Sequence, residues 1–265
     1  MAAKLAPDSW IVGKTYGIRS HLEQQECALL LDLDGTLIRG GQAIPGAVEF
    51  VSRHHSRIAI VTNNSSDTPA SMAARLGEMG LNIPSDLIFL AGVSAAEHIA
   101  REHPGKTVMI LGSPELKAFA SSLGLELSDH RPEIVLVGRD ESFNYAKLAT
   151  AGNAVAAGAK FYASNSDVFH PGPVCLRVPE TGSLTVAIMA LAGRSPDRVY
   201  GKPDAHMLVR ALERLQRPRA SAIMIGDNPT TDGQAARNAN IRFIEVGDHV
   251  GRSIADVGVW LEKSL

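Results

Sequence analysis

The chain has 265 residues, a formal net charge of −2 and a pI near 6.5, with 45% hydrophobic and 20% charged residues. This balance is typical of a soluble globular enzyme with one large or two modest domains, and it favours neither nucleic acid nor an anionic membrane as a partner. No apolar run approaches the roughly 20 residues of a membrane span, and the first 26 residues hold no stretch long enough for a signal peptide.

The cysteine content points to a reducing compartment. Only Cys27 and Cys175 are present, too few for a disulfide scaffold at this length. The cytoplasm is therefore the expected location.

The N-terminal extension, residues 1–26, precedes the first clear strand. We expect it to form either a helix packed on the core or an arm, and we assign it no chemistry.

Strand-like and helical patterns alternate along the rest of the chain. The strand-like runs are continuously apolar, as in strands that are covered on both faces. This alternation predicts an α/β fold with a doubly wound, mainly parallel sheet. Strands are expected at 28–34, 57–63, 107–112, 133–138, 160–165, 221–228 and 241–246; helices are expected at 45–55, 68–80, 94–102, 115–123, 143–157, 182–192, 204–216 and 231–239, and at the C-terminus.

Polar residues follow several of these strands. Ligands of an open parallel sheet collect beyond the carboxyl ends of its strands, so we expect these side chains to meet in one crevice. They are Asp32 and Asp34 after the first strand, Thr62 and Asn63 after the second, Lys202 in a short segment, and Asp227 and Asp232 after a later strand.

A hard divalent cation would explain why several carboxylates lie together. Mg²⁺ prefers oxygen ligands and usually binds one or two carboxylates together with a substrate phosphate. An aspartate can attack phosphorus to form an aspartyl-phosphate, and a second carboxyl group can move the protons. The residues thus predict phosphoryl transfer with Asp32 as nucleophile, Asp34 as acid and base, and Mg²⁺ as cofactor.

The spacing of these residues predicts an inserted domain. Thr62 and Lys202 are 140 residues apart, and the segment between them carries strand and helix patterns of its own. We expect a catalytic core formed by 1–93 and 180–265 and an inserted α/β cap at 94–179. A cap over a polar crevice can exclude water and contribute substrate contacts.

Four motifs, "DLDGTL", "VTN", "GKP" and "GDNPTTD", resemble in content and order those of the haloacid dehalogenase-like superfamily. Residues 137–167 are similar to the cap segment of its NagD-like and nitrophenylphosphatase-like branch. The resemblance implies a Rossmann-like core, a large C2-type cap and a Mg²⁺-dependent phosphomonoester hydrolase. For catalysis, it implies Asp32 as the nucleophile and Asp34 as the general acid and base. For phosphate binding, it implies Thr62 and the backbone of Asn63, with Lys202 between nucleophile and phosphate. For the metal, it implies Asp32, the backbone carbonyl of Asp34 and Asp227 as ligands, with Asp232 supporting the metal shell.

The segment 165–183 departs from the pattern of these relatives. Ser166 stands where proline is common, and the usual glycine-rich substrate loop is not recognisable. Asn165, Asp167 and His170 are candidate contacts between cap and substrate. The substrate is expected to be a small phosphorylated metabolite of the nucleotide or sugar phosphate type, and the sequence is compatible with a homodimer without fixing the oligomeric state.

Alternative interpretations remain open for both residues and function. Asp232 could be an ordinary first-turn acid of the following helix, Thr62 a strand-end residue, and Lys202 a solvated surface lysine. A phosphomutase would use the same residues. A signalling domain phosphorylated on aspartate is disfavoured by the long insertion, and a dehalogenase is disfavoured by Asp34.

Overall fold

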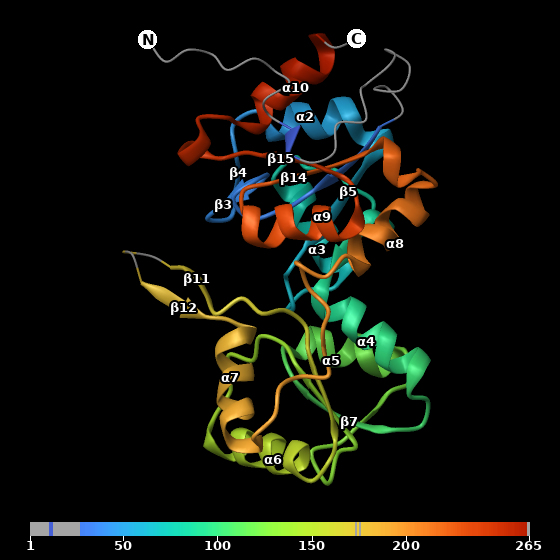
Figure 1. Cartoon of the computed structure of the whole chain (residues 1–265), viewed down its shortest axis with the longest axis vertical. Helices are drawn as coiled ribbons and strands as arrows, with labels where there is room; N and C mark the ends of the chain where they lie inside the picture. The colour runs from blue at the N-terminus through green and yellow to red at the C-terminus, as the bar shows by residue number, and fades with distance from the viewer. Residues whose placement is uncertain (1–10, 13–26, 173, 175, 264–265) are drawn as a thin grey trace. The chain divides into compact units, whose positions relative to one another are not determined.

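The computed structural model describes residues 11–12, 27–172, 174 and 176–263. The chain divides into two compact units, shown in Figure 1. The first unit comprises Met1–Thr62, Ala70–Phe89 and Lys202–Leu265, and the second comprises Asn63–Pro69 and Leu90–Gly201. The expectation for the N-terminal extension lies outside the described residues, except for Ile11 and Val12, which form a strand.

The first unit is built on a six-stranded sheet in the order β1-β15-β14-β2-β5-β6. Strands β15, β14, β2 and β5 are parallel, and β1 pairs antiparallel with β15 at the edge. All residues of β2, β5 and β14 are buried, which explains their continuously apolar sequences. The strands are β1 (Ile11–Val12), β2 (Ala28–Leu31), β5 (Ile58–Thr62), β6 (Ile88–Leu90), β14 (Ala222–Gly226) and β15 (Arg242–Glu245).

Helices of the first unit bury one apolar face each. In α8 the buried residues are Met207, Leu208, Ala211 and Leu212, a helical spacing that packs them against β2 and β5. The helix α10 packs on α2 and confirms the predicted closing helix. The helices are α2 (Ala47–His54), α3 (Pro69–Glu78), α8 (His206–Leu215), α9 (Gln234–Ala239) and α10 (Ile254–Lys263), with short turns at His55–Arg57, Ser85–Leu87, Arg219–Ser221, Pro229–Gly233 and Asp248–Val250; a small hairpin is formed by β3 (Ile38–Arg39) and β4 (Gln42–Ala43).

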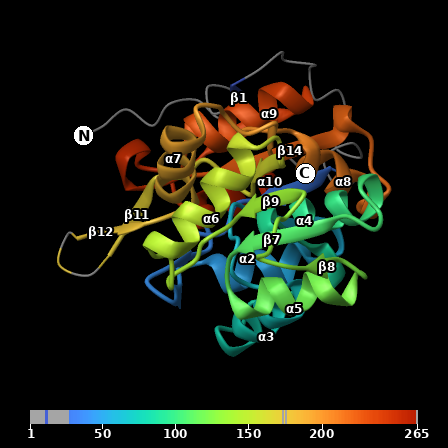
Figure 2. The same ribbon diagram turned by 90° about the horizontal axis from the view of Figure 1, so that it is seen from below.

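The second unit has a five-stranded, wholly parallel sheet in the order β13-β10-β9-β7-β8. Helices α4 and α5 lie on one side of this sheet and α6 and α7 on the other (Figure 2). Alternate residues of β7 face these two layers: Val108 and Ile110 pack with α4 and α5, whereas Met109 and Leu111 pack with α6 and α7. The strands are β7 (Thr107–Leu111), β8 (Glu126–Leu127), β9 (Ile134–Val137), β10 (Lys160–Ala163) and β13 (Arg198–Val199); the helices are α4 (Ala91–Glu102), α5 (Pro114–Ser122), α6 (Tyr145–Ala156) and α7 (Thr181–Ala192); β11 (Phe169–Pro171) and β12 (Arg177–Pro179) form a hairpin.

The α/β fold with mainly parallel sheets is confirmed, but the second unit is longer than the predicted insertion at 94–179. Helix α7 packs against α6, β9 and β10, and β13 pairs with β10, so residues 180–201 belong to the second unit. Leu90 to Val93 join it because α4 begins at Ala91. That this unit serves as a cap stays a prediction. Among the described residues, every helix is too short or too polar to cross a membrane.

Candidate active site

Three aspartates meet at the carboxyl edge of the sheet in the first unit. Asp32 directly follows β2, and its N–H donates to the carbonyl of Ile225 on β14 at 2.9 Å. Asp227 follows the end of β14, and Asp232 lies in the turn Pro229–Gly233. Carboxylate oxygens of Asp32, Asp227 and Asp232 lie within 4.8 Å of one another, which is close enough to hold one metal ion.

Lys202 is buried against two of these acids. Its Nζ lies 2.5 Å from Oδ1 of Asp32 and 2.7 Å from Oδ1 of Asp232, and its side chain is 2% exposed. Burial alone would lower the pKa of Lys202, but the charges of Asp232 and Asp32 outweigh burial and raise that pKa. The lysine is therefore a fixed positive charge, and its interpretation as a solvated surface residue is wrong.

Three carboxyl groups of the cluster share the single positive charge of Lys202. Burial, followed by the nearby charge of Asp32, raises the pKa of Asp227 to about 6. Burial also raises the pKa of Asp232, although Lys202 opposes this shift. Uncompensated carboxylates that converge in this way offer the oxygen ligands and the charge that a hard divalent cation prefers, so the residues present fit Mg²⁺.

Two glycines allow the acids to approach the backbone. Gly35 has a φ of +86°, and a Cβ at this position would overlap the carboxylate of Asp227; a Cβ at Gly226 would overlap the carboxylate of Asp232. Asp232 also accepts the N–H of Asn228 at 3.1 Å and is 1% exposed. It therefore lies in the buried cluster, and it is also an acid in the first turn of the helical segment Pro229–Gly233. Sequence analysis passed over both glycines, although each lies beside an acid in a quoted motif.

The turn after Asp32 adds one residue that sequence analysis missed. Thr36 is buried, and its Oγ1 donates to Oδ2 of Asp32 at 3.2 Å. Asp34 is exposed and its carboxylate is not among the three that cluster, while its backbone bridges to Ile38. An acid/base role for Asp34, and a metal contact through its carbonyl, stay predictions.

The remaining predicted residues divide between the two units. Thr62 is buried at the end of β5, the strand next to β2. Asn63 belongs to the second unit, where its Nδ2 donates to Oδ2 of Asp167 at 3.0 Å and its carbonyl accepts Nδ2 of Asn165 at 2.7 Å. Asn165 and Asp167 thus bind the protein chain itself, and their contact with substrate stays a prediction.

His170 has a partner in the same hairpin region of the second unit. Its Nδ1 lies 2.7 Å from Oε1 of Glu180, and Arg139 also approaches that carboxylate at 3.4 Å. A contact of His170 with substrate stays a prediction.

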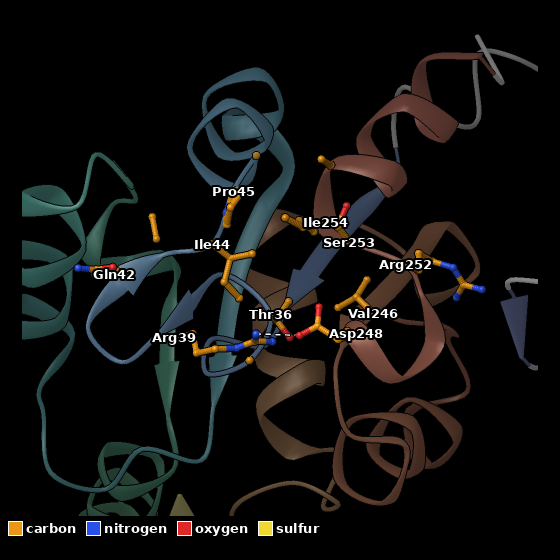
Figure 3. Close-up of a pocket in the computed structure, with 15 residues that line it drawn as sticks. Thr36, Arg39, Gln42, Ile44, Pro45, Val246, Asp248, Arg252, Ser253 and Ile254 are labelled. Carbon is orange, nitrogen blue, oxygen red and sulfur yellow. Dashed lines mark hydrogen bonds and ion pairs between the residues drawn. The ribbon is translucent and has the colours of Figure 1, made fainter. Parts of the chain in front are cut away.

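A cavity of about 650 Å³ adjoins the Gly35–Thr36 turn in the first unit (Figure 3). Its charged groups are engaged with neighbours: Arg39 pairs with Asp248 at 3.0 Å, and Arg252 donates to the carbonyl of Glu245 at 2.7 Å. The hydroxyl of Ser253, the residue before α10, donates a hydrogen bond to Oδ2 of Asp256 at 2.7 Å. We therefore assign no chemistry to this cavity.

Comparison with known proteins agrees with the motifs. A family model described as haloacid dehalogenase-like hydrolase matches residues 29–126, and one described as HAD-hydrolase-like matches 199–255. The chain is 36% identical over 223 residues to the acid sugar phosphatase of Staphylococcus saprophyticus, covering 83% of this chain and 85% of the relative.

Two solved structures extend this similarity to the fold. NagD from E. coli K-12 superposes with a TM-score of 0.78 at 27% identity, covering 86% of this chain and 97% of that protein. Glycerol phosphate phosphatase from Mycobacterium tuberculosis, solved in complex with magnesium, superposes with a TM-score of 0.76 at 33% identity, covering 82% of this chain and 67% of that protein. The expected similarity to the NagD-like branch is confirmed.

Proposed function

Because the chain belongs to the haloacid dehalogenase-like hydrolase family and is a phosphomonoester hydrolase, we propose that it hydrolyses small sugar phosphates through an aspartyl-phosphate on Asp32. The observation that carries this proposal is the environment of the Asp32 carboxylate. Oδ1 contacts the Lys202 ammonium and Oδ2 accepts the Thr36 hydroxyl, so the group is held in a fixed orientation at a strand end. An oriented carboxylate of this kind is suited to nucleophilic attack.

The reaction divides into two displacements at phosphorus. In the first, an oxygen of Asp32 forms a bond to phosphorus while the bond to the sugar oxygen breaks, and Asp34 gives a proton to that leaving oxygen. In the second, Asp34 takes a proton from water, whose oxygen attacks phosphorus and releases inorganic phosphate and the free Asp32 carboxylate. Lys202 and Thr62, with the backbone N–H of Asn63, supply positive charge and donors to the phosphoryl oxygens.

Mg²⁺ is the cofactor that this set of oxygen ligands fits. Asp32, Asp227 and Asp232 would hold it, with the carbonyl of Asp34 as the further ligand that the family resemblance implies. When bound, the ion neutralises negative charge of the carboxylates and of the transferring phosphoryl group. The raised pKa of Asp227 supports the need for such a cation at this position.

The names of two relatives support the proposed substrate class. One is called acid sugar phosphatase and the other glycerol phosphate phosphatase, and each similarity spans most of this chain. Small polyol or sugar phosphates are therefore the proposed substrates, in preference to nucleotides.

The test is release of inorganic phosphate from a panel of sugar, polyol and nucleotide monophosphates with and without Mg²⁺. The proposal predicts Mg²⁺-dependent release that favours the sugar and polyol esters and disappears in Asp32→Asn with the fold intact. Full turnover in that variant would refute the assigned nucleophile. Transfer of phosphate to a second sugar, in place of release, would identify a phosphomutase.

A further inference from the structure

Asn165 and Asp167 form a turn at the carboxyl end of β10, and this turn binds Asn63. The Asn165 side chain is 1% exposed; its Nδ2 donates to the carbonyl of Asn63 at 2.7 Å, and its Oδ1 accepts the N–H of Asp167 at 3.0 Å. Asp167 in turn accepts the side-chain amide of Asn63 at 3.0 Å. Both the main chain and the side chain of Asn63 are therefore fixed by one short segment.

The same turn also contacts Gly201. A Cβ at this glycine would lie only 2.6 Å from Oδ1 of Asn63 and 2.8 Å from Cβ of Asn165, so the chain here packs directly on both residues. The chain passes from one unit to the other between Thr62 and Asn63 and again between Gly201 and Lys202. Asn165 thus holds the chain one residue after Thr62 and one residue before Lys202.

The turn has its own anchor within the second unit. Nδ2 of Asn165 also donates to the hydroxyl of Thr181, at 3.3 Å. That hydroxyl lies 3.1 Å from Oγ of Ser65, which accepts the N–H of Arg139 at 2.9 Å. Thr181 and Ser65 are buried. A buried and connected polar network of this kind is rigid, because breaking one bond leaves desolvated groups without partners.

We infer that Asn165 and Asp167 are positioning residues for phosphate recognition, acting through Asn63 and Gly201 without touching substrate. The inference rests on the proposed function, in which Thr62, Asn63 and Lys202 bind the phosphoryl group. Small displacements of such groups are costly, since a shift of about 1 Å can reduce a rate about a hundredfold. This assignment differs from the sequence-based expectation that both residues contact the substrate from a cap.

Inhibition by inorganic phosphate separates the two roles. Inorganic phosphate has no leaving group, so a residue that contacts only the sugar leaves its inhibition constant unchanged. Asn165→Asp keeps the size of the side chain and the acceptor for the Asp167 N–H but removes the donor to the Asn63 carbonyl. We expect the inhibition constant of phosphate to rise about tenfold or more, with an equal fall in kcat/KM for two substrates with different leaving groups.

Ser166→Ala is the matched control. Ser166 lies in the same turn and is exposed, and its side chain makes no hydrogen bond to any residue that the structure describes. This variant should have the same inhibition constant for phosphate and the same kcat/KM as the wild type. A purely structural role of Asn165 would lower the melting temperature and the active fraction, but it would leave the inhibition constant unchanged because that constant does not depend on enzyme concentration.

A pair of variants at Asp167 provides a second test if Asn165→Asp does not fold. Asp167→Asn retains an oxygen that accepts from Asn63, whereas Asp167→Ala does not, so the inhibition constant should rise in the alanine variant and stay near the wild-type value in the asparagine variant. Equal loss in both variants would indicate a charged contact with substrate and overturn the inference. If the wild type is active and these variants bind phosphate normally, the positioning inference is overturned and the proposed function stands. If the wild type hydrolyses no phosphate ester, the proposed function is overturned as well.

Discussion

Replacing Lys202 by methionine tests the electrostatic organisation of the acid cluster. The variant keeps an apolar stem of similar length but removes the charge that lies 2.5 Å from Asp32 and 2.7 Å from Asp232, where the lysine side chain is 2% exposed. Breaking a buried ion pair by removing one partner costs about 3–5 kcal/mol, because a buried charge is left uncompensated. We therefore expect the free energy of unfolding at pH 8 to fall by about 3–5 kcal/mol, a large share of the roughly 5–15 kcal/mol of a typical domain.

The loss should depend on pH with a defined sign. Without the lysine, the pKa of Asp232 rises further above its value in the unfolded chain, so the folded variant binds more protons than the unfolded chain near neutral pH. Stability must then increase as the pH falls, and the difference between wild type and variant should be smaller at pH 5 than at pH 8. Urea unfolding of both proteins at pH 5 and pH 8 measures this difference in the free energy of unfolding.

An exposed ion pair of the same length supplies the control. Lys106 lies 2.5 Å from Glu133, but the two side chains are 52% and 44% exposed, so Lys106→Met should change stability little. If Lys202→Met were as harmless as Lys106→Met at pH 8, burial would not govern the strength of these pairs and the reasoning would be refuted.

Three further predictions concern the metal, a histidine and a glycine. Mg²⁺ should raise the melting temperature of the wild type but not of Asp227→Asn, which calorimetric or fluorescence melting curves measure; equal shifts would place the ion elsewhere. Burial, followed by the charges of Arg57 and Arg53, lowers the pKa of His54 from 6.5 to about 4. Between these pH values the unfolded chain binds a proton that the folded chain does not, so the free energy of unfolding of the wild type falls by up to about 3 kcal/mol as the pH falls. In urea unfolding at pH 7 and 4.5, the free energy of unfolding of His54→Leu should fall less than that of the wild type, and an identical fall would contradict the lowered pKa. Gly35→Ala should abolish Mg²⁺-dependent turnover and lower stability by about 1 kcal/mol or more, because its φ of +86° is strained for alanine and the new Cβ overlaps the Asp227 carboxylate; normal turnover would contradict this packing.

The sequence predicted the parts of the molecule that depend on local pattern. The apolar run of β2 followed by Asp32 indicated both a buried strand and the edge at which the acids meet, because parallel strands end at a common edge. The position of Lys202 in the cluster followed from motif order. The burial of Lys202 could not be predicted in the same way, because a short loop has no hydrophobic periodicity that indicates which of its side chains are buried.

Features that depend on pairing across long distances could not be predicted. Helix α7 reads as an apolar helix in either unit, and only its packing on β9 and β10 assigns it to the second unit. The two-residue strand β1 is defined by its partner β15, about 230 residues away. The candidate roles of Asn165 and Asp167 come from the family resemblance. Their partner, Asn63, could not be predicted, because it lies about 100 residues earlier in the chain and meets them only in the folded second unit.

The central claim is that Asp32 carries the phosphoryl group during turnover. The most direct measurement is to quench the enzyme during turnover of a sugar phosphate with Mg²⁺, reduce it with borohydride, and map the modified residue by mass spectrometry. Reduction of an aspartyl-phosphate converts the aspartate to homoserine, and the account predicts this change at Asp32 only when both substrate and Mg²⁺ are present. Rapid phosphate release with Asp32 unmodified, or modification of Asp227 or Asp232 in its place, would contradict it.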